Sequence, residues 1–514
     1  MISVPVVPMH RGLERAAERH PNRVAIRFED TEWTWRQLDE ASNAFARHLR
    51  GSVNRGDRVA IMSGNRPEFV IAVNAISKLR AATVLVSPAW KHLEVDHALE
   101  ITGARYAITD ESSYPMLKAR LGTEGVTNLD DIPALAGILG GNSSPLGLQP
   151  PTAEEEAVLV FSSGTTGLPK AVRHTHLSIG HGIDHWVASL GLTRDDRFQI
   201  ATPPSHILGL LNFLTAAAAG ATVRLHRRFD LDELLRRIQD ERMTLEMAVA
   251  PIALAMADHP SIEDYDLSSL RYIMWGATPV TPSVAERVTA RTGVRWMPAY
   301  GASELPVITC NPIGRPDEWR LDSAGLPAPG VQVRVVDLET RQVLPPGPRN
   351  VGEIQVLSPS AMTGYLPQED TAAAFHDGWY RTGDVGWIEA EGWVHLTDRA
   401  KEMIKVKGFQ VAPAEIEAVL HGHAAVRDCA VFGVPDHVAG ELPVAAVLLD
   451  PEHPTSPDEL RALVAESLAT YKQLRDVVVV EEIPRLPSGK VLRRVLQQQW
   501  VEQHPVDRTP DTSG

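Results

Sequence analysis

The segment Phe161-Ser-Ser-Gly-Thr-Thr-Gly-Leu-Pro-Lys170 gathers two serines, two threonines, two glycines and a lysine within nine residues after Phe161. It continues from the apolar run Ala157–Phe161, which has the composition of a buried strand. Glycines let backbone N–H groups approach an anion, hydroxyls donate further hydrogen bonds, and lysine adds charge. The segment is therefore interpreted as a phosphate-handling loop, with a Ser/Gly-rich surface turn as the alternative. It is not a Walker A loop, because Leu-Pro separates its second glycine from the lysine.

Short apolar runs and helical patterns alternate on the N-terminal side of this loop. Arg58–Met62 and Arg105–Thr109 are apolar, lie near turn residues and predict buried parallel strands. Thr34–Gln37 is a T-x-x-Q capping box that predicts the start of a helix. The helix is supported by apolar residues at helical spacing, namely Leu38, Ala41, Phe45 and Leu49. This alternation predicts an α/β fold, with parallel sheets covered by helices in layers.

The pattern changes to a smaller α+β unit after Asp398. Helices are predicted from Pro413 to about Leu420 and near Leu460–Ala469, and strands near Ala430–Val434 and Val477–Val480. The predicted organisation is a large layered N-terminal domain (1–398), a hinge (399–402), a small C-terminal domain (403–502) and a flexible tail (503–514).

Composition excludes several classes of protein. The formal net charge of −15 argues against sequence-independent binding to nucleic acid or to an anionic membrane. Cys310 and Cys429 form no disulfide framework and have no metal-ligand spacing around them, so we interpret both as buried residues in a reducing compartment. No apolar run approaches the ~20 residues of a membrane span, and no basic region precedes the apolar N-terminus. A soluble, cytoplasmic protein is predicted, with its oligomeric state left open.

Four further motifs follow the loop along the chain, and the five together resemble a known superfamily. They are Tyr300-Gly-Ala-Ser-Glu304, Tyr380-Arg-Thr-Gly-Asp384, Asp398-Arg-Ala-Lys-Glu-Met-Ile-Lys-Val-Lys-Gly-Phe-Gln-Val-Ala-Pro-Ala-Glu415 and Pro487-Ser-Gly-Lys-Val-Leu-Arg493. Their order is similar to that of the acyl-CoA synthetase, luciferase and peptide-synthetase adenylation superfamily, and the domain junction resembles the coumarate–CoA ligase and luciferase branch. The resemblance implies an AMP-forming acid–CoA ligase that requires ATP, Mg²⁺ and coenzyme A. Its partner would be a small carboxylic acid.

Position within these motifs implies a nucleotide site. Tyr300 would stack on adenine, Asp384 would accept the ribose hydroxyls, and Arg399 would contact ribose or phosphate. Glu304 would hold Mg²⁺ on the triphosphate, since this cation prefers carboxylate and phosphate oxygens. The full set of implied ATP and AMP ligands is Ser162, Ser163, Gly164, Thr165, Thr166, Lys170, Gly276, Ala277, Thr278, Tyr300, Gly301, Ser303, Asp384 and Arg399.

Lys490, His206 and Glu304 are the implied catalytic residues. Attack of a carboxylate on a triphosphate is opposed by charge repulsion, and the Lys490 ammonium would offset this repulsion in the transition state. His206 would donate to the bound carboxylate or screen it from water. A lone histidine or a Ser-Gly-Lys turn is ordinarily structural, so both roles depend on the resemblance.

The resemblance also implies that the small domain is mobile. It would rotate at Lys401 between an adenylating and a thioester-forming arrangement, where backbone freedom matters more than charge. In the second arrangement the loop containing Gly408 would admit the pantetheine arm, and Lys407 would meet a phosphate of coenzyme A. The residues assigned to the hinge and to coenzyme A are Lys401, Lys405, Lys407, Gly408 and Phe409.

By alignment, the acid pocket is lined mainly by apolar residues with one amide. Its predicted walls are Leu208, Asn212, Met274, Ala277, Ala299, Val307 and Ile308. Such a pocket suits an aromatic or medium-length acid. Leu208 stands where hydroxycinnamate ligases often have tyrosine, and Ala299 replaces a glycine that commonly floors a long pocket. Ala171 and Trp275 are two further departures from the pattern. These differences argue against a hydroxycinnamate substrate.

Two rival functions stay open at this point. The same adenylation could serve another acceptor: a carrier protein, an amine, or nitrite as in enzymes that diazotise aryl amines. A non-catalytic nucleotide-binding relative is opposed by the presence of Lys490, Glu304 and Asp384.

Overall fold

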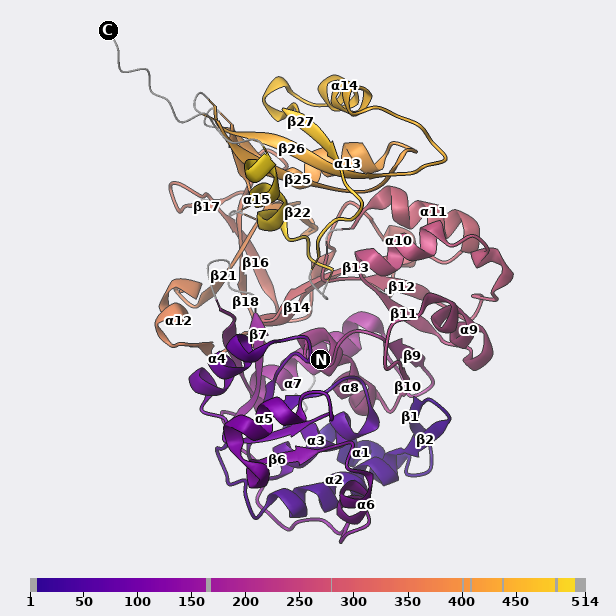
Figure 1. The fold of residues 1–514 in the computed structure, drawn as a ribbon, viewed down its shortest axis with the longest axis vertical. Helices are drawn as coiled ribbons and strands as arrows, with labels where there is room; N and C mark the ends of the chain where they lie inside the picture. Colours follow the sequence, from indigo (N-terminus) through magenta and orange to yellow (C-terminus); the bar gives the residue numbers. More distant parts are fainter. Residues whose placement is uncertain are drawn as a thin grey trace.

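The computed structural model describes residues 7–162, 168–278, 280–399, 402–406, 409–436, 439–485 and 489–503, without the side chain of Gln410. Within these ranges a large N-terminal part carries a smaller unit at its top (Figure 1). Both parts mix helices and sheets, as the sequence predicts.

The segment that precedes the predicted phosphate loop is a strand inside a mostly parallel sheet of seven strands. Its strand order is β19-β8-β7-β4-β3-β5-β6. The strands are β3 (Arg58–Met62), β4 (Ala82–Leu85), β5 (Tyr106–Thr109), β6 (Val126–Asn128), β7 (Glu156–Ser162), β8 (Lys170–Thr175) and β19 (Gly364–Leu366). Strands β3, β4, β5, β6 and β7 run parallel. The three strands predicted around 58–62, 105–109 and 157–161 are confirmed to within one residue.

Helices on this layer include the one predicted from the capping box. The helices are α1 (Arg11–Arg19), α2 (Trp35–Leu49), α3 (Pro67–Lys78), α4 (His92–Thr102), α5 (Tyr114–Leu121) and α6 (Ile132–Leu139). At the start of α2, the Thr34 hydroxyl accepts the Gln37 N–H at 3.3 Å, and the Gln37 side chain accepts the Thr34 N–H at 2.8 Å. The four apolar residues predicted to face the core are all buried. Local sequence therefore fixes both the start and the buried face of α2.

Two further sheets complete the layers of the large domain. One has the order β2-β1-β10-β9 and the other β11-β12-β13-β14-β15. The strands are β1 (Val24–Phe28), β2 (Thr31–Thr34), β9 (Arg197–Ile200), β10 (Thr222–Leu225), β11 (Leu245–Ala248), β12 (Tyr272–Trp275), β13 (Trp296–Ala302), β14 (Leu305–Cys310) and β15 (Leu326–Pro327). Helix α7 (His176–Leu190) contacts β7, β8 and β14, and α8 (Ile207–Ala219) contacts β10 and β14, so this helix pair lies between sheets. Helices α9 (Leu231–Glu241), α10 (Ala250–Asp258) and α11 (Pro282–Thr292) pack beside β11 and β12 (Figure 1).

An antiparallel sheet joins the large domain to the small one. Its order is β17-β16-β18-β21-β20, and β22 pairs with β21. Its elements are β16 (Gln332–Val336), β17 (Val343–Leu344), β18 (Gly352–Leu357), α12 (Glu369–Ala374), β20 (Phe375–His376), β21 (Trp379–Ile388) and β22 (Val394–Arg399).

The small unit has a sheet and hydrophobic clusters of its own. Its elements are β23 (Ile404–Val406), β24 (Phe409–Val411), α13 (Pro413–His421), β25 (Val426–Asp436), β26 (Gly440–Leu449), α14 (Pro457–Ser467), β27 (Asp476–Val479) and α15 (Arg493–Gln503). The buried residues of both hydrophobic clusters all come from Ile404 onward. The predicted helices and strands of this unit correspond to α13, α14, β25 and β27.

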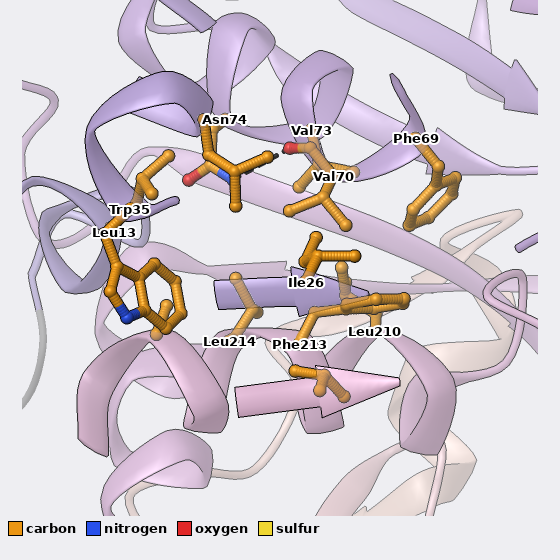
Figure 2. A pocket seen from close by; sticks show the side chains of 13 residues that line it. Leu13, Ile26, Trp35, Phe69, Val70, Val73, Asn74, Leu210, Phe213 and Leu214 are labelled. Atoms are coloured by element: carbon orange, nitrogen blue, oxygen red, sulfur yellow. Dashed lines mark hydrogen bonds between the residues drawn. The ribbon is translucent and has the colours of Figure 1, made fainter. Parts of the chain in front are cut away.

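A cavity inside the large domain is unrelated to the motifs. It is bounded by α1, α2, α3, α8, β1 and β10, and Figure 2 shows Leu13, Trp35, Phe69 and Phe213 pointing into it. Its volume is about 20 Å³, and its walls are almost entirely apolar. A space of this size holds about one water molecule, so it is a packing defect and cannot accept an organic acid.

Glu246 predicts a specific dependence of stability on pH. This residue of β11 is 1% exposed, and its carboxyl accepts the Gln199 Nε2–H at 2.9 Å. Burial raises the pKa of Glu246 to about 8, against an ordinary value of 4.5. Unfolding therefore releases a proton between these two pKa values, so stability falls as pH rises through that window, by up to ~1.4 kcal/mol per pH unit. Glutamine has the shape of the protonated acid, so Glu246→Gln should raise the unfolding free energy near pH 7.5 and leave it unchanged near pH 4.

Urea unfolding of both proteins across this pH range measures the difference. Glu391→Gln, at an exposed position, is the matched control. Parallel stability profiles for wild type and Glu246→Gln would show that Glu246 is ionised in the folded protein.

Candidate active site

The second and third motifs meet through Tyr300 and Asp384. Tyr300 lies on β13 and Asp384 on β21, and the Tyr300 hydroxyl donates a hydrogen bond to the Asp384 carboxylate. Arg399 Nε lies 3.0 Å from the other oxygen of Asp384. Burial raises the pKa of the Asp384 carboxyl, whereas the Arg399 guanidinium opposes that shift. The structure thus joins three predicted nucleotide residues from β13, β21 and the end of β22.

Glu304 occupies the turn between β13 and β14. Its side chain is buried, and its Oε1 accepts the hydroxyl proton of Tyr365 at 2.8 Å. Among the described residues, no group of three or more His, Cys, Asp or Glu side chains could enclose a metal ion. A single carboxylate nevertheless fits Mg²⁺ bound together with a nucleotide, because this ion usually takes one or two carboxylates and completes its shell with phosphate oxygens and water.

Lys490 of the small domain faces the same site. A Cβ added to Gly489, which has a φ of +84°, would lie 2.9 Å from Pro251 Cδ and 3.4 Å from Thr278 Cγ2 of the large domain. Gly489, the neighbour of Lys490, therefore lies directly against the large domain. Lys490 Nζ lies 3.6 Å from Glu402 Oε1. Burial, followed by repulsion from Arg399, lowers the pKa of Lys490 below that of an ordinary lysine, and the charge of Asp384 acts in the opposite direction.

The segment after β12 forms a wall beside these residues. Gly276 approaches the Met274 sulfur and the Ala299 carbonyl. Ala277 is exposed and has a φ of +64°, a conformation that residues other than glycine rarely adopt. The Thr278 hydroxyl accepts the Ala250 N–H at 3.0 Å and the Trp275 Nε1–H at 3.1 Å. Trp275, a departure from the family pattern, thus supports the turn from beneath.

The phosphate loop is described only at its ends. Ser162 closes β7 and Lys170 opens β8, whereas Ser163, Gly164, Thr165 and Thr166 lie outside the described residues. Lys170 Nζ lies 2.7 Å from Asp370 Oδ1, and both side chains are about one-third exposed. A phosphate would therefore compete with Asp370 for this ammonium. Only glycine fits at position 301, because a Cβ there would lie 2.1 Å from the Pro306 carbonyl oxygen. The Ser303 carbonyl bonds with His174 Nε2 at 2.8 Å.

His206 and the first pocket residues stand at the start of α8. His206 is half-buried, and burial lowers the pKa of its imidazole, which favours the neutral form. Leu208 and Asn212 share one face of α8, one turn apart. The Asn212 carbonyl accepts the Trp186 Nε1–H at 2.8 Å, whereas its amide nitrogen has no hydrogen-bond partner among the described residues. The unpartnered group of Asn212 is therefore a donor, and the side chain is fully buried.

The remaining pocket residues differ in exposure. Met274, Val307 and Ile308 are fully buried in the core of the large domain, and Ala299 is half-buried. Ala299 and Met274 both adjoin Gly276. Met274 and Ala299 therefore lie next to the segment that is predicted to contact the nucleotide.

The two described residues among those assigned to the hinge and to coenzyme A, Lys405 and Phe409, make contacts within the small domain. The Phe409 ring stacks on Tyr471 with centroids 4.5 Å apart, and the Lys405 N–H donates to Glu441 at 2.8 Å. Lys401, Lys407 and Gly408 lie outside the described residues. The described arrangement therefore brings Lys490, and not this strand pair, to the nucleotide residues.

A second hollow of about 490 Å³ lies between the N-terminal segment and the loop 145–150. None of the predicted site residues lines it. Its buried cation, Lys78, is paired with Asp39 at 2.5 Å and with the Asn43 carbonyl at 2.7 Å.

Several residues of the site escape sequence reasoning. Tyr365, Asp370 and Glu402 contact Glu304, Lys170 and Lys490, respectively. Tyr365 and Glu304 lie 61 positions apart, so no local spacing links them. The only sequence signal is that Glu402 falls inside the junction motif and Tyr365 follows a glycine.

Among the described helices, none has the length and apolar character needed to cross a membrane.

Comparison with known families assigns most of the chain. Residues 13–366 match the family model described as "AMP-binding enzyme", and residues 415–490 match "AMP-binding enzyme C-terminal domain". The chain is 32% identical over 463 residues to 4-coumarate–CoA ligase 3 of Arabidopsis thaliana, covering 87% of this chain and 82% of the relative.

Solved structures with similar folds include two at 30% identity. One is the o-succinylbenzoate CoA synthetase of Bacillus subtilis in complex with its acyl-adenylate intermediate, with a TM-score of 0.83 over 95% of this chain and 97% of that one. The other is the amide bond synthetase McbA of Marinactinospora thermotolerans, with a TM-score of 0.85 over 96% of this chain and 100% of that one.

Proposed function

Because the chain belongs to the AMP-binding enzyme family, we propose that it is an AMP-forming acid–CoA ligase that uses ATP, Mg²⁺ and coenzyme A. The observation that supports this most strongly is the position of Lys490. A lysine from the small domain faces Asp384 of the large domain and Arg399 at the start of the proposed hinge, and the neighbouring Gly489 lies against Pro251. A mobile cation above a buried carboxylate suits transfer between two anionic substrates.

The first half-reaction joins the acid to AMP. A carboxylate oxygen of the acid attacks the α-phosphorus of ATP, the bond from that phosphorus to the β-phosphate bridge breaks, and pyrophosphate leaves. Lys490 bridges the two anions while charge moves between them. Asp384, oriented by Tyr300 and Arg399, accepts the ribose hydroxyls. Glu304 would hold Mg²⁺, which would supply charge neutralisation on the triphosphate when bound. Neutral His206 donates an N–H to the acid.

The second half-reaction transfers the acyl group to a thiol. The sulfur of coenzyme A attacks the acyl carbon, AMP leaves with the bridging oxygen, and the thiol proton passes to solvent. The lysine loop must first leave the large domain. We therefore keep the predicted organisation as part of the proposal: a large domain to 398, a hinge at 399–402 around Lys401, a mobile domain to 502, and a tail from 503. Lys405, Lys407, Gly408 and Phe409 then approach the thiol substrate.

The compartment we propose is the cytoplasm. Cys310 and Cys429 are both free and buried, as in proteins kept in a reducing environment. ATP and coenzyme A are both available there.

The acid is proposed to be aromatic or of medium length, without a para hydroxyl. Leu208 cannot hydrogen-bond a phenol, and burying an unpaired hydroxyl costs ~1–3 kcal/mol. An unsubstituted aryl acid should therefore have a kcat/KM ~5–100-fold above that of its 4-hydroxy counterpart, and Leu208→Tyr should narrow that ratio. Kinetics on matched pairs of acids measure it.

Leu208→Met is the control, because it keeps an apolar side chain of similar volume. The Asn212 amide offers the opposing contact, since it can donate to a hydroxyl oxygen. A wild-type preference for the hydroxylated acid that disappears in Asn212→Ala would assign specificity to Asn212 and contradict the role of Leu208.

A second candidate keeps the adenylation and changes the acceptor. The likeness to an amide bond synthetase favours an amine in place of the thiol; a carrier protein or nitrite belongs to the same class of alternative. Loss of free thiol and release of AMP, measured together, separate the candidates. The ligase should form one thioester for each AMP released. If the rate of AMP release did not depend on coenzyme A but rose on addition of an amine, the alternative would be favoured.

A further inference from the structure

The segment 362–371 donates two hydrogen bonds to Glu304. The Met362 N–H donates to the Glu304 backbone carbonyl at 2.8 Å, and the Tyr365 hydroxyl donates to Glu304 Oε1 at 2.8 Å. The backbone of Glu304 is therefore held by Met362, two residues before β19, and its side chain by Tyr365 of β19. A glutamate held in this way loses most of its rotamer freedom before any ligand arrives.

The Tyr365 ring is itself fixed from several sides. Its residue pairs with Val172 in the β19–β8 ladder, and its N–H donates to the Thr371 hydroxyl at 2.9 Å. Lys170 Nζ lies 5.7 Å from the ring centroid. These contacts leave the hydroxyl little freedom to move away from Glu304.

We propose that Tyr365 is a positioning residue for the metal site, holding Oε1 of Glu304 so that Oε2 faces the Mg²⁺ of the bound nucleotide. This inference rests on the metal role of Glu304 in the proposed function. A single carboxylate binds a metal ion weakly unless its orientation is fixed. Residues that orient a metal ligand typically contribute about 10–100-fold to metal affinity.

The same strand connects the metal carboxylate to the phosphate loop. Strand β19 pairs with β8, and β8 begins at Lys170, whose partner Asp370 lies five residues beyond Tyr365. The two ends of the triphosphate site, Lys170 and Glu304, are therefore braced by the single segment 364–371. Tyr365 is the residue of that segment that reaches Glu304 through its side chain.

The coupling between Mg²⁺ and ATP measures this role without turnover. Equilibrium dialysis of labelled ATP, without acid, gives one Kd in saturating Mg²⁺ and another in EDTA. The Kd in EDTA divided by the Kd in Mg²⁺ reports how far the metal tightens nucleotide binding. In Tyr365→Phe, which keeps the ring, the ratio should fall about tenfold, while the Kd in EDTA stays at the wild-type value. In a Glu304→Gln background, Tyr365→Phe should add no further loss.

Tyr106→Phe is the matched control. It also removes a buried hydroxyl with a 2.8 Å hydrogen bond, to Thr127, on the seven-stranded sheet, and should lower Tm without changing the ratio. Three outcomes overturn the inference. The first is a wild-type ratio in Tyr365→Phe, and the second is a higher Kd for ATP in EDTA in that variant. The third is a further fall of about tenfold in the ratio when Tyr365→Phe is added to Glu304→Gln. If the wild-type protein binds ATP equally with and without Mg²⁺, the proposed metal role of Glu304 fails as well.

Discussion

Lys490→Ala is expected to slow acyl-adenylate formation by ~10²–10³-fold, the scale of removing one preorganised electrostatic donor. The lysine lies beside Arg399 and Asp384, where burial removes competing water. In the proposed mechanism its ammonium is the cation that the small domain brings to the two anionic substrates. Thioester formation from a pre-made acyl-adenylate should stay close to wild type, because that step follows departure of the lysine loop.

Single-turnover assays of the two half-reactions measure this difference. Lys118→Ala, on α5 of the large domain, removes an exposed lysine far from the motifs and should leave both rates unchanged. If Lys490→Ala slowed both half-reactions by the same factor, one arrangement of the domains would serve both steps.

Gly489→Ala should have the second largest effect on adenylation, because it displaces the residue next to Lys490 by a steric clash and leaves the charge of the lysine unchanged. The added Cβ would lie 2.9 Å from Pro251 Cδ, closer than side chains can pack, and the φ of +84° strains any residue with a Cβ. The loop must shift outward and carry Lys490 with it. A displacement of about 1 Å can reduce a rate ~10²-fold, so adenylation should fall by ~10–10²-fold while thioester formation from the adenylate is spared.

Gly330→Ala separates crowding from backbone strain. Gly330 has a similar φ of +81°, and a Cβ there would meet nothing within 4 Å. It carries the same conformational cost without the contact, so adenylation should remain near wild type. Equal losses of adenylation in the two variants would mean that strain, and not the contact with Pro251, explains the Gly489 result.

Prediction from sequence succeeded where the signal is local. The capping box at Thr34 and the helical spacing after it identify α2, and the apolar run at Arg58–Met62 is a strand of the main sheet. The helices of the small domain were equally predictable, since α13 begins at the predicted Pro413. In these cases the residues that decide the structure lie within a few positions of each other.

The candidate site could be anticipated only through motifs, and their supporting contacts were not readable. Tyr300 and Asp384, 84 positions apart, were each named by their motif, but nothing in either motif indicates that the tyrosine donates to the aspartate. The partners of Lys170 and Glu304 were missed for the same reason. Asn212 was predicted as a pocket wall, but only the fold shows that Trp186 occupies its carbonyl. Contacts of this kind depend on how sheets and helices come together in space.

The most direct measurement of the central claim is exchange of labelled pyrophosphate into ATP, in the absence of coenzyme A, over a panel of aromatic and medium-chain acids. An enzyme that forms an acyl-adenylate reversibly should show exchange that depends on a suitable acid, needs Mg²⁺ and is lost in Lys490→Ala. Exchange that requires coenzyme A to be present would contradict a separate adenylation step. Cleavage of ATP to ADP and phosphate with these acids would contradict the account altogether.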